Sequence, residues 1–317
     1  MTTRPAPRSP SDHPDIETPP FRLGGGEFLG AGLQRVALEE IDYAIAALRS
    51  FRLDIGVHES RKAFRRVRAA LRLVRDPLGY GVYRAENVAL RDLGRLIGGS
   101  RDATVMVETV VGLSYLYGDV LQPGAFDTLR SNLLERDKLI RRRVTGDRIE
   151  SVVTGLEAAR DRFAAWDRHL LDDGFESVAG GLHRVYRRGR RRMADAYREP
   201  SSEAFHVWRK RVRYLRFQMA LLEGMWPELQ RGIATDLEYL ADALGAEHDL
   251  AELHRLLDTE PEMLPSDTAR QVLQGILVGN QARLRRACEP VGARLYSEAP
   301  NDFVRRLGGY WEVWRPA

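Results

Sequence analysis

Apolar residues recur at intervals of three and four from Phe21 onward, and the period-two alternation of half-buried strands is scarce. This spacing is typical of amphipathic helices, so the sequence predicts an all-α fold. Residues 1–20, rich in Pro, Ser and Thr, are predicted to form a disordered tail. The predicted helices are Glu27–Ser50, Asp54–Arg75, Tyr83–Leu96, Arg101–Tyr117, Ala125–Val144, Arg148–Leu170, Glu176–Tyr197, Ser202–Leu222, Leu229–Leu244, Asp249–Leu257, Asp267–Cys288 and Asp302–Leu307.

Three short patterns occur twice in the same order. GLQRV at Gly32–Val36 returns as GLHRV 149 residues later, and a His followed by Arg-Lys returns after 148. The third pattern, Gly98 with Arg101 and Asp102, returns after 147 as Gly245 with His248 and Asp249. Collinear matches at a nearly constant offset indicate an internal duplication. We therefore expect two helical bundles, the first from about 21–172 and the second from about 173–317. Related halves commonly pack about a pseudo-twofold axis, which predicts a basic groove between them.

Two of the predicted helices carry a cationic row on one face. Their opposite faces are apolar, with Phe64, Val67, Leu71 and Val74 on the first helix and Val212, Leu215, Met219 and Leu222 on the second. The rows follow from the turn of about 100° per residue. Their members are His58, Arg61, Lys62, Arg65, Arg68 and Arg72 in the first helix, and His206, Arg209, Lys210, Arg213 and Arg216 in the second.

The two rows lack the acids that normally balance a solvated helix face. No Asp or Glu occurs between Lys62 and Arg75, or between Ala204 and Leu222. Like charges three and four positions apart repel, so the rows indicate an anionic partner. The alternative interpretation is an ordinary basic surface in an arginine-rich chain. Against it, the pattern is repeated, and two of only three lysines occupy the same place in both copies.

Composition narrows the class of protein. The chain has 317 residues, 44% hydrophobic and 30% charged, with a net charge of only +4, so its basicity is local. The single Cys288 excludes an internal disulfide and is expected to be a packed helical residue. No apolar run reaches the roughly 20 residues of a membrane span, and no secretory signal is visible. The cytoplasm is the expected compartment.

These motifs resemble the CHAD domain, the conserved histidine α-helical domain. The resemblance rests on the duplicated His–Arg–Lys helix, on LIGGSRD at Leu96–Asp102 and LGAEHD at Leu244–Asp249, and on GLHRVYRRGRRR at Gly181–Arg192. It spans about Phe21 to Trp314. It implies two pseudosymmetric helical bundles around a basic groove, binding of inorganic polyphosphate, and localisation to polyphosphate granules. The ExExK motif of the CYTH triphosphatase domain, often fused to CHAD, does not occur, so this is expected to be a stand-alone CHAD protein.

Arginine suits a phosphate polymer because its planar fork of donors matches phosphate oxygens. Sulfate or single phosphate ions are expected at the same positions. The pKa values of His58 and His206 should rise beside phosphates, so affinity is predicted to strengthen as pH falls from about 8 to 6. Candidate secondary contacts are Arg35, Arg184, Arg187, Arg188 and Arg191.

Other functions have less support in the sequence. Asp102 and Asp249 are interpreted as helix caps, HESR lacks the second His of a zinc motif, and no P-loop occurs, so no metal, cofactor or catalytic residue is predicted. A phosphohydrolase would require a metal site that the sequence does not indicate. The alternative function is nucleic-acid binding through the same rows. A predicted lack of exposed aromatic residues, with Trp208 assigned to the core, disfavours it. The oligomeric state stays open.

Overall fold

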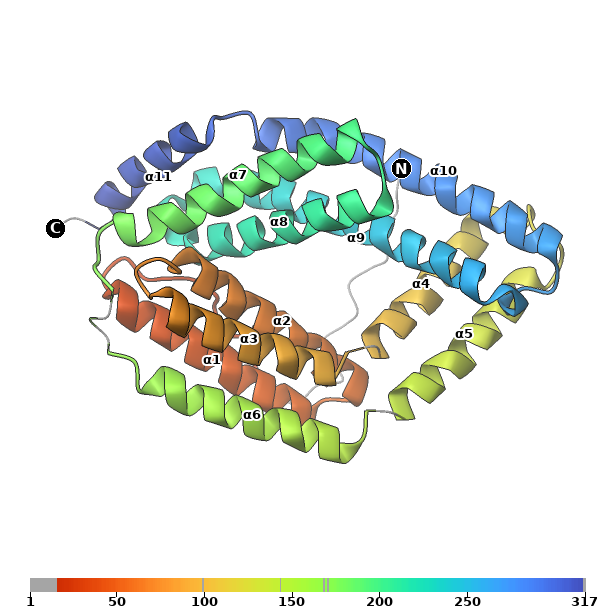
Figure 1. Cartoon of the computed structure of the whole chain (residues 1–317), viewed down its shortest axis with the longest axis horizontal. Helices are drawn as coiled ribbons and strands as arrows, with labels where there is room; N and C mark the ends of the chain where they lie inside the picture. Colours follow the sequence, from red (N-terminus) through yellow and green to blue (C-terminus); the bar gives the residue numbers. More distant parts are fainter. Residues whose placement is uncertain (1–15, 99, 143, 168, 170, 316–317) are drawn as a thin grey trace.

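The computed structural model describes residues 16–315, except 99, 143, 168 and 170 (Figure 1). Within this part of the chain every regular element is a helix, which confirms the predicted all-α class. The helices are α1 (Leu29–Ser50), α2 (Leu53–Leu73), α3 (Tyr80–Leu96), α4 (Ser100–Tyr117), α5 (Ala125–Arg142), α6 (Gly146–Ala164), α7 (Glu176–Arg198), α8 (Ser202–Leu221), α9 (Pro227–Thr259), α10 (Asp267–Leu295) and α11 (Pro300–Trp314), with 3₁₀ turns at Glu223–Met225 and Pro261–Met263.

The largest departure from the predicted elements is α9, which runs unbroken through Gly245 where two helices were expected. The interpretation of Asp249 as a helix cap is therefore wrong. A glycine inside a helix costs only about 1 kcal/mol. Leu244 packs in one hydrophobic core and Leu250 in another, so both parts of the helix are held. The cap interpretation of Asp102 lies outside the described residues.

The C-terminal helices are longer than predicted. α10 continues past Pro290 to Leu295, although proline lacks the backbone donor of a helix interior. A side chain at Gly292 would meet Met193 and Trp208, so this last part of α10 lies close against α7 and α8. Cys288 is fully buried, as predicted.

Part of the predicted N-terminal tail is packed. Ile16 contacts the hydrophobic core, and the Thr18 hydroxyl donates to the Tyr43 hydroxyl at 3.4 Å. Farther along, the Leu23 amide donates to the Leu221 carbonyl at 2.9 Å and joins this segment to α8. The prediction of disorder is therefore wrong for residues 16–20, and residues 1–15 lie outside the described part.

Two hydrophobic cores hold the helices together, and both draw on residues from either side of the predicted boundary near residue 172. The first core includes Leu33 of α1, Val67 of α2, Leu182 of α7, Leu215 of α8 and Leu240 of α9. The second includes Leu113 of α4, Leu129 of α5, Leu253 of α9 and Leu273 of α10. Each core therefore joins early and late segments of the chain.

α2 lies in the middle of the molecule, where it packs against α1, α3, α7 and α8 (Figure 1). Two glycines permit this close packing. A methyl group at Gly56 would meet the Ala47 carbonyl of α1, and one at Gly181 of α7 would overlap the Leu73 carbonyl at the end of α2. The contact between α2 and α8 places the two predicted basic helices side by side.

Candidate functional site

The apolar faces of α2 and α8 are buried as predicted. Phe64, Val67 and Leu71 on α2, like Val212 and Leu215 on α8, are at most 3% exposed. Trp208 is fully buried, which confirms its assignment to the core. With these faces turned inward, the opposite faces leave the row arginines half-buried along the contact between the helices.

Four arginines from the two rows form one group, the central cationic cluster of Arg61, Arg65, Arg209 and Arg213. Burial, followed by the charges of Arg213, Arg61 and Arg209, lowers the pKa of Arg65 to about 9. Burial, followed by Arg209 and with Arg61 contributing, lowers the pKa of Arg213 to about 10. Arg209 and Arg213 of α8 lower the pKa of Arg65, and Arg61 of α2 lowers that of Arg213, so members of both rows lie close together. Even with these lowered pKa values, Arg65 and Arg213 remain cationic at neutral pH.

A second set of cations surrounds Tyr214 of α8. The Arg72 guanidinium lies 4.3 Å from the ring centroid and that of Arg211 lies 5.8 Å away. Burial alone would raise the tyrosine pKa, but Arg72, Arg68 and Arg211 outweigh it and lower the pKa. Arg211 was not among the predicted site residues, because its helical phase separates it from the row. The contact with Tyr214 connects it to the row through cation–π attraction.

The N-terminal end of the α2 row includes an acid that the sequence argument did not weigh. Glu59 lies 3.3 Å from the Lys62 Nζ and 3.8 Å from the His58 Nε2. On α8, Arg216 pairs with Glu238 of α9 at 3.1 Å, whereas Lys210 is exposed. The N-terminal end of the α2 row and the C-terminal end of the α8 row are therefore partly neutralised.

A histidine from α9 joins the α8 row. The Nδ1 atoms of His206 and His248 lie 3.1 Å apart, and their rings are 4.3 Å apart at the centroids. His248 stands in the LGAEHD motif, of which only Asp249 was given a role, that of a helix cap. The repetition of that motif was the available signal for its importance. Within the described residues no group of three or more His, Cys, Asp or Glu side chains could hold a metal ion.

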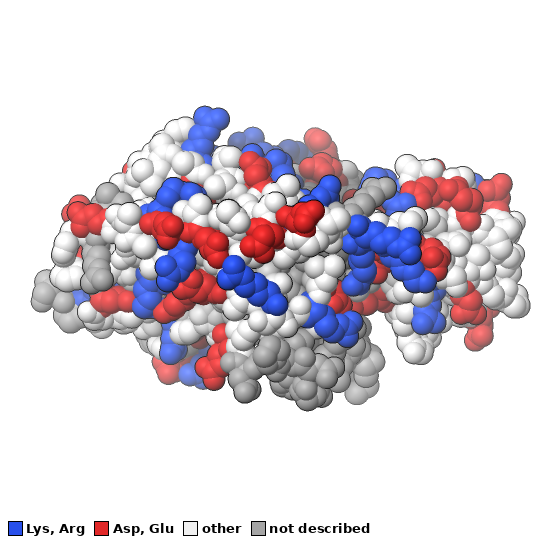
Figure 2. Space-filling view, turned by 90° about the horizontal axis from the view of Figure 1, so that it is seen from below, with Lys and Arg blue, Asp and Glu red and all other residues white. Residues whose placement is uncertain are grey.

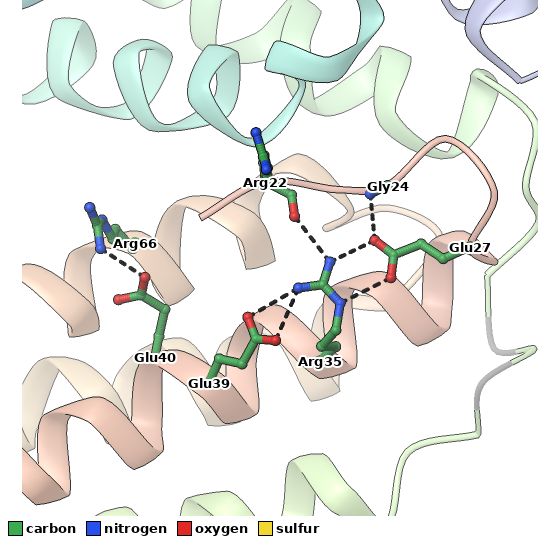
Figure 3. A network of polar contacts seen from close by, with 7 residues as sticks. All are labelled: Arg22, Gly24, Glu27, Arg35, Glu39, Glu40 and Arg66. Atoms are coloured by element: carbon green, nitrogen blue, oxygen red, sulfur yellow. Dashed lines mark hydrogen bonds and ion pairs between the residues drawn. The ribbon is translucent and has the colours of Figure 1, made fainter. Parts of the chain in front are cut away.

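The candidate secondary contacts divide into two groups. Arg35 forms ion pairs with Glu27 at 2.7 Å and Glu39 at 3.0 Å and also donates to the Arg22 carbonyl (Figure 3). Its positive charge is therefore neutralised by these two carboxylates. The hydrogen bonds that Arg35 donates to Glu27 are the largest of the effects that raise the pKa of Arg35. Arg184 forms an ion pair with Asp76. We therefore leave Arg35 and Arg184 out of the proposed site.

The remaining secondary candidates lie on the exposed side of α7. Arg187 and Arg188 are exposed, while Arg191 is 3.9 Å from Asp195. Arg188 contributes to the lowered pKa of Arg211, after burial and the opposing effect of Tyr214. This places Arg188 near the cations around Tyr214, so it is the secondary candidate with a structural connection to the rows.

On the face seen in Figure 2, acidic and basic side chains are interspersed. Within the described residues no helix combines the length and apolar composition needed to cross a membrane.

The predicted lack of exposed aromatic residues is wrong, since Tyr80 is 58% and Tyr115 85% exposed. That argument against a base-containing ligand therefore no longer holds.

The protein belongs to the all-α class and carries clustered basic side chains on two contacting helices, α2 and α8. Comparison with known proteins gives its family. The CHAD domain family model matches residues 35–258. The crystal structure of the CHAD domain from the plant Ricinus communis is similar to this chain, with a TM-score of 0.65 and 17% identity over 90% of this chain and 97% of that one. No curated protein sequence matches the chain. Because the family model covers most of its length, the chain belongs to the CHAD domain family.

Proposed function

We propose that this protein binds inorganic polyphosphate, without catalysis, through the facing sides of α2 and α8. The observation that carries the proposal is the pair Arg65 and Arg213. Arg213 lowers the pKa of Arg65, Arg61 and Arg209 lower the pKa of both, and among the described residues no carboxylate forms an ion pair with either. Buried like charges without an acid cost stability. A linear polyanion would supply the missing negative charge.

The arrangement of the cations suits a polymer better than a single small ion. Arg65 and Arg72 are about 10 Å apart along α2, by the rise of 1.5 Å per residue. Beyond the central cationic cluster, the α2 row continues through Arg68 to Arg72, which lies among the cations around Tyr214. A flexible chain of phosphates could contact these guanidinium groups in succession, with bidentate hydrogen bonds at each. The α2 and α8 rows would then line the predicted basic groove.

Family membership supports the same ligand. CHAD domains are linked to polyphosphate and form a family of non-catalytic helical domains. For this chain, the proposal extends to association with polyphosphate granules. It also includes occupation of the central cationic cluster by sulfate or phosphate ions when polymer is absent. The proposed contacts are His58, Arg61, Lys62, Arg65, Arg68 and Arg72 on α2, and His206, Arg209, Lys210, Arg213 and Arg216 on α8.

The test compares two variants that lose equal charge. The first changes the central cationic cluster, Arg61, Arg65, Arg209 and Arg213, to Ala. The matched control changes four exposed arginines, each paired with an acid outside the rows, to Ala: Arg231, Arg255, Arg294 and Arg305. Both variants and the wild type are titrated with long-chain polyphosphate, and circular dichroism verifies their helical content.

Polyphosphate binding that survives in the control and is lost in the cluster variant would support the proposal. Binding should weaken steeply with salt, because a polyanion releases counterions when it is neutralised. Unlabelled RNA serves as competitor and separates the nucleic-acid alternative. Equal loss of binding in both variants, or displacement of polyphosphate by low concentrations of RNA, would contradict a dedicated polyphosphate site.

A further inference from the structure

A basic and aromatic hollow lies at the start of α3, beside the C-terminal end of α2. It is open to solvent and has a volume of about 720 Å³, within the usual range of small-molecule sites. Three of its nine lining residues are arginines, two are tyrosines and none is acidic. The lining residues are Arg75, Tyr80, Gly81, Tyr83, Arg84, Ala85, Asn87, Val88 and Arg91.

The two tyrosines form an aromatic wall supported by one arginine. The Arg75 guanidinium lies 5.2 Å from the ring centroid of Tyr80 and 5.2 Å from that of Tyr83. The ring centroids are 6.4 Å apart, with an angle of 39° between the planes. Tyr80 is 58% exposed, so much of its ring remains accessible. Aromatic faces beside arginine are the groups on which nucleobases stack.

The cations of the hollow are available to a phosphate. Within the described residues neither Arg75 nor Arg84 forms an ion pair with an acid, whereas Arg91 is held by Asp92 at 2.8 Å. The hollow also adjoins the α2 row, because the Arg68 Nε donates to the Asn87 Oδ1 at 3.1 Å. Unneutralised guanidinium groups next to an aromatic wall suit a ligand that combines a base with phosphates.

We propose that this hollow binds a free nucleoside polyphosphate, with its base on Tyr80 and its phosphates on Arg75 and Arg84. The site is separate from the central cationic cluster, since its aromatic wall and Arg84 belong to α3. A phosphate chain that extends from the hollow would meet Arg68 of the α2 row. The protein would thereby distinguish a phosphate chain that carries a base from one that does not, which goes beyond the proposed binding of polyphosphate.

The experiment compares ATP with inorganic tripolyphosphate by calorimetric titration. ATP should bind the wild type at least about fivefold more tightly, the factor that corresponds to the lower end of base stacking. Tyr80→Leu should abolish this preference, and Tyr80→Phe should retain it because the ring is kept. Tyr115→Leu is the matched control, since Tyr115 is an exposed tyrosine of α4 outside the hollow.

The same titrations on the variant that lacks the central cationic cluster separate this proposal from the previous one. A preference for ATP that persists there supports the hollow, even if polyphosphate binding fails in every protein. Equal affinity for ATP and tripolyphosphate in the wild type, or an unchanged preference in Tyr80→Leu, would overturn it. Single-stranded RNA that binds more tightly than ATP and depends on Tyr80 would overturn the assignment to a free nucleotide.

Discussion

The Nδ1 atoms of His206 on α8 and His248 on α9 lie 3.1 Å apart. One Nδ1 must donate and the other accept, so the contact excludes a proton on both. Burial and then Arg209 lower the pKa of His248 to about 4, and burial and then Lys210 lower that of His206, while Glu252 opposes both shifts. The free fold therefore loses stability as pH falls from 6.5 toward 4, because the unfolded chain binds these protons more readily.

We expect polyphosphate affinity to strengthen as pH falls below 6.5 toward 4. Bound phosphate would offset Arg209, Lys210 and Arg213, which together with burial disfavour a charged His206 or His248. Binding would then take up protons, and the gain extends to lower pH than the interval of 8 to 6 predicted from the sequence. The measurement is the ratio of affinities at pH 5.0 and 7.5.

A double variant, His206→Gln with His248→Gln, isolates this effect from titration of the polymer ends. Its affinity ratio should be smaller than that of the wild type. His254→Gln, six residues farther along α9, should keep the wild-type ratio. If the double variant and the wild type gave the same ratio, the histidine pair would not be coupled to binding.

Replacement of Arg65 by Met should stabilise the free protein and weaken its binding. The side chain is buried among Arg61, Arg209 and Arg213, and a hydrophobic residue of similar volume removes that repulsion. We expect the free energy of unfolding in urea to rise by about 1–4 kcal/mol. Polyphosphate affinity should fall about tenfold or more, as for loss of a hydrogen bond to a charged group.

Arg231→Met is the control for this trade-off, because Arg231 is exposed and paired with Glu228 at 3.4 Å. Its stability should change by no more than about 0.5 kcal/mol. Destabilisation by Arg65→Met, or unchanged affinity, would show that Arg65 is structural and does not meet the ligand.

The buried ion pair of Glu40 and Arg66 should make stability depend on pH (Figure 3). Glu40 is 1% exposed and accepts from the Arg66 Nη1 at 2.9 Å, yet burial outweighs Arg66 and raises the pKa of Glu40 to about 7. A raised carboxyl pKa gives stability that is present below 4.5 and is lost as pH rises through 7. Arg66→Met should cost about 3–5 kcal/mol at pH 8 and less at pH 5.5.

Urea unfolding of Arg66→Met at both pH values measures this difference. Addition of Glu40→Gln to Arg66→Met removes the buried charge and should abolish the difference between pH 5.5 and pH 8. A cost that is equal at the two pH values would indicate that Arg66 stabilises the fold by packing alone.

Gly181→Ala should destabilise the contact between α7 and α2. The new methyl group would overlap the Leu73 carbonyl, and backbone cannot yield as a flexible side chain does. We expect a loss of about 1–3 kcal/mol in the free energy of unfolding, as for an overpacked core. Gly309→Ala in α11 is the control, because its methyl group meets nothing within 4 Å and should stabilise the helix by up to about 1 kcal/mol. Equal effects of the two substitutions would contradict the close approach of α7 to α2.

Much of the candidate site could be predicted because helical periodicity is local. The spacing around Phe64 and Val212 identified the buried faces of α2 and α8, and their opposite faces carry the rows. The same reasoning missed Arg211 and His248. Arg211 joins the row only through Tyr214, and His248 meets His206 from another helix. Neither relationship has a period along the chain.

Local backbone geometry let the sequence alone determine the all-α class, the two cationic rows and their apolar backs, since rise and turn per residue establish which side chains share a face. Only the tertiary structure decided which faces meet. The close approach at Gly181 and the shared cores set α2 against α7 and α8, which brings Arg65 near Arg213. Packing between distant segments depends on the fit of complete surfaces, and helical periodicity contains no record of that fit.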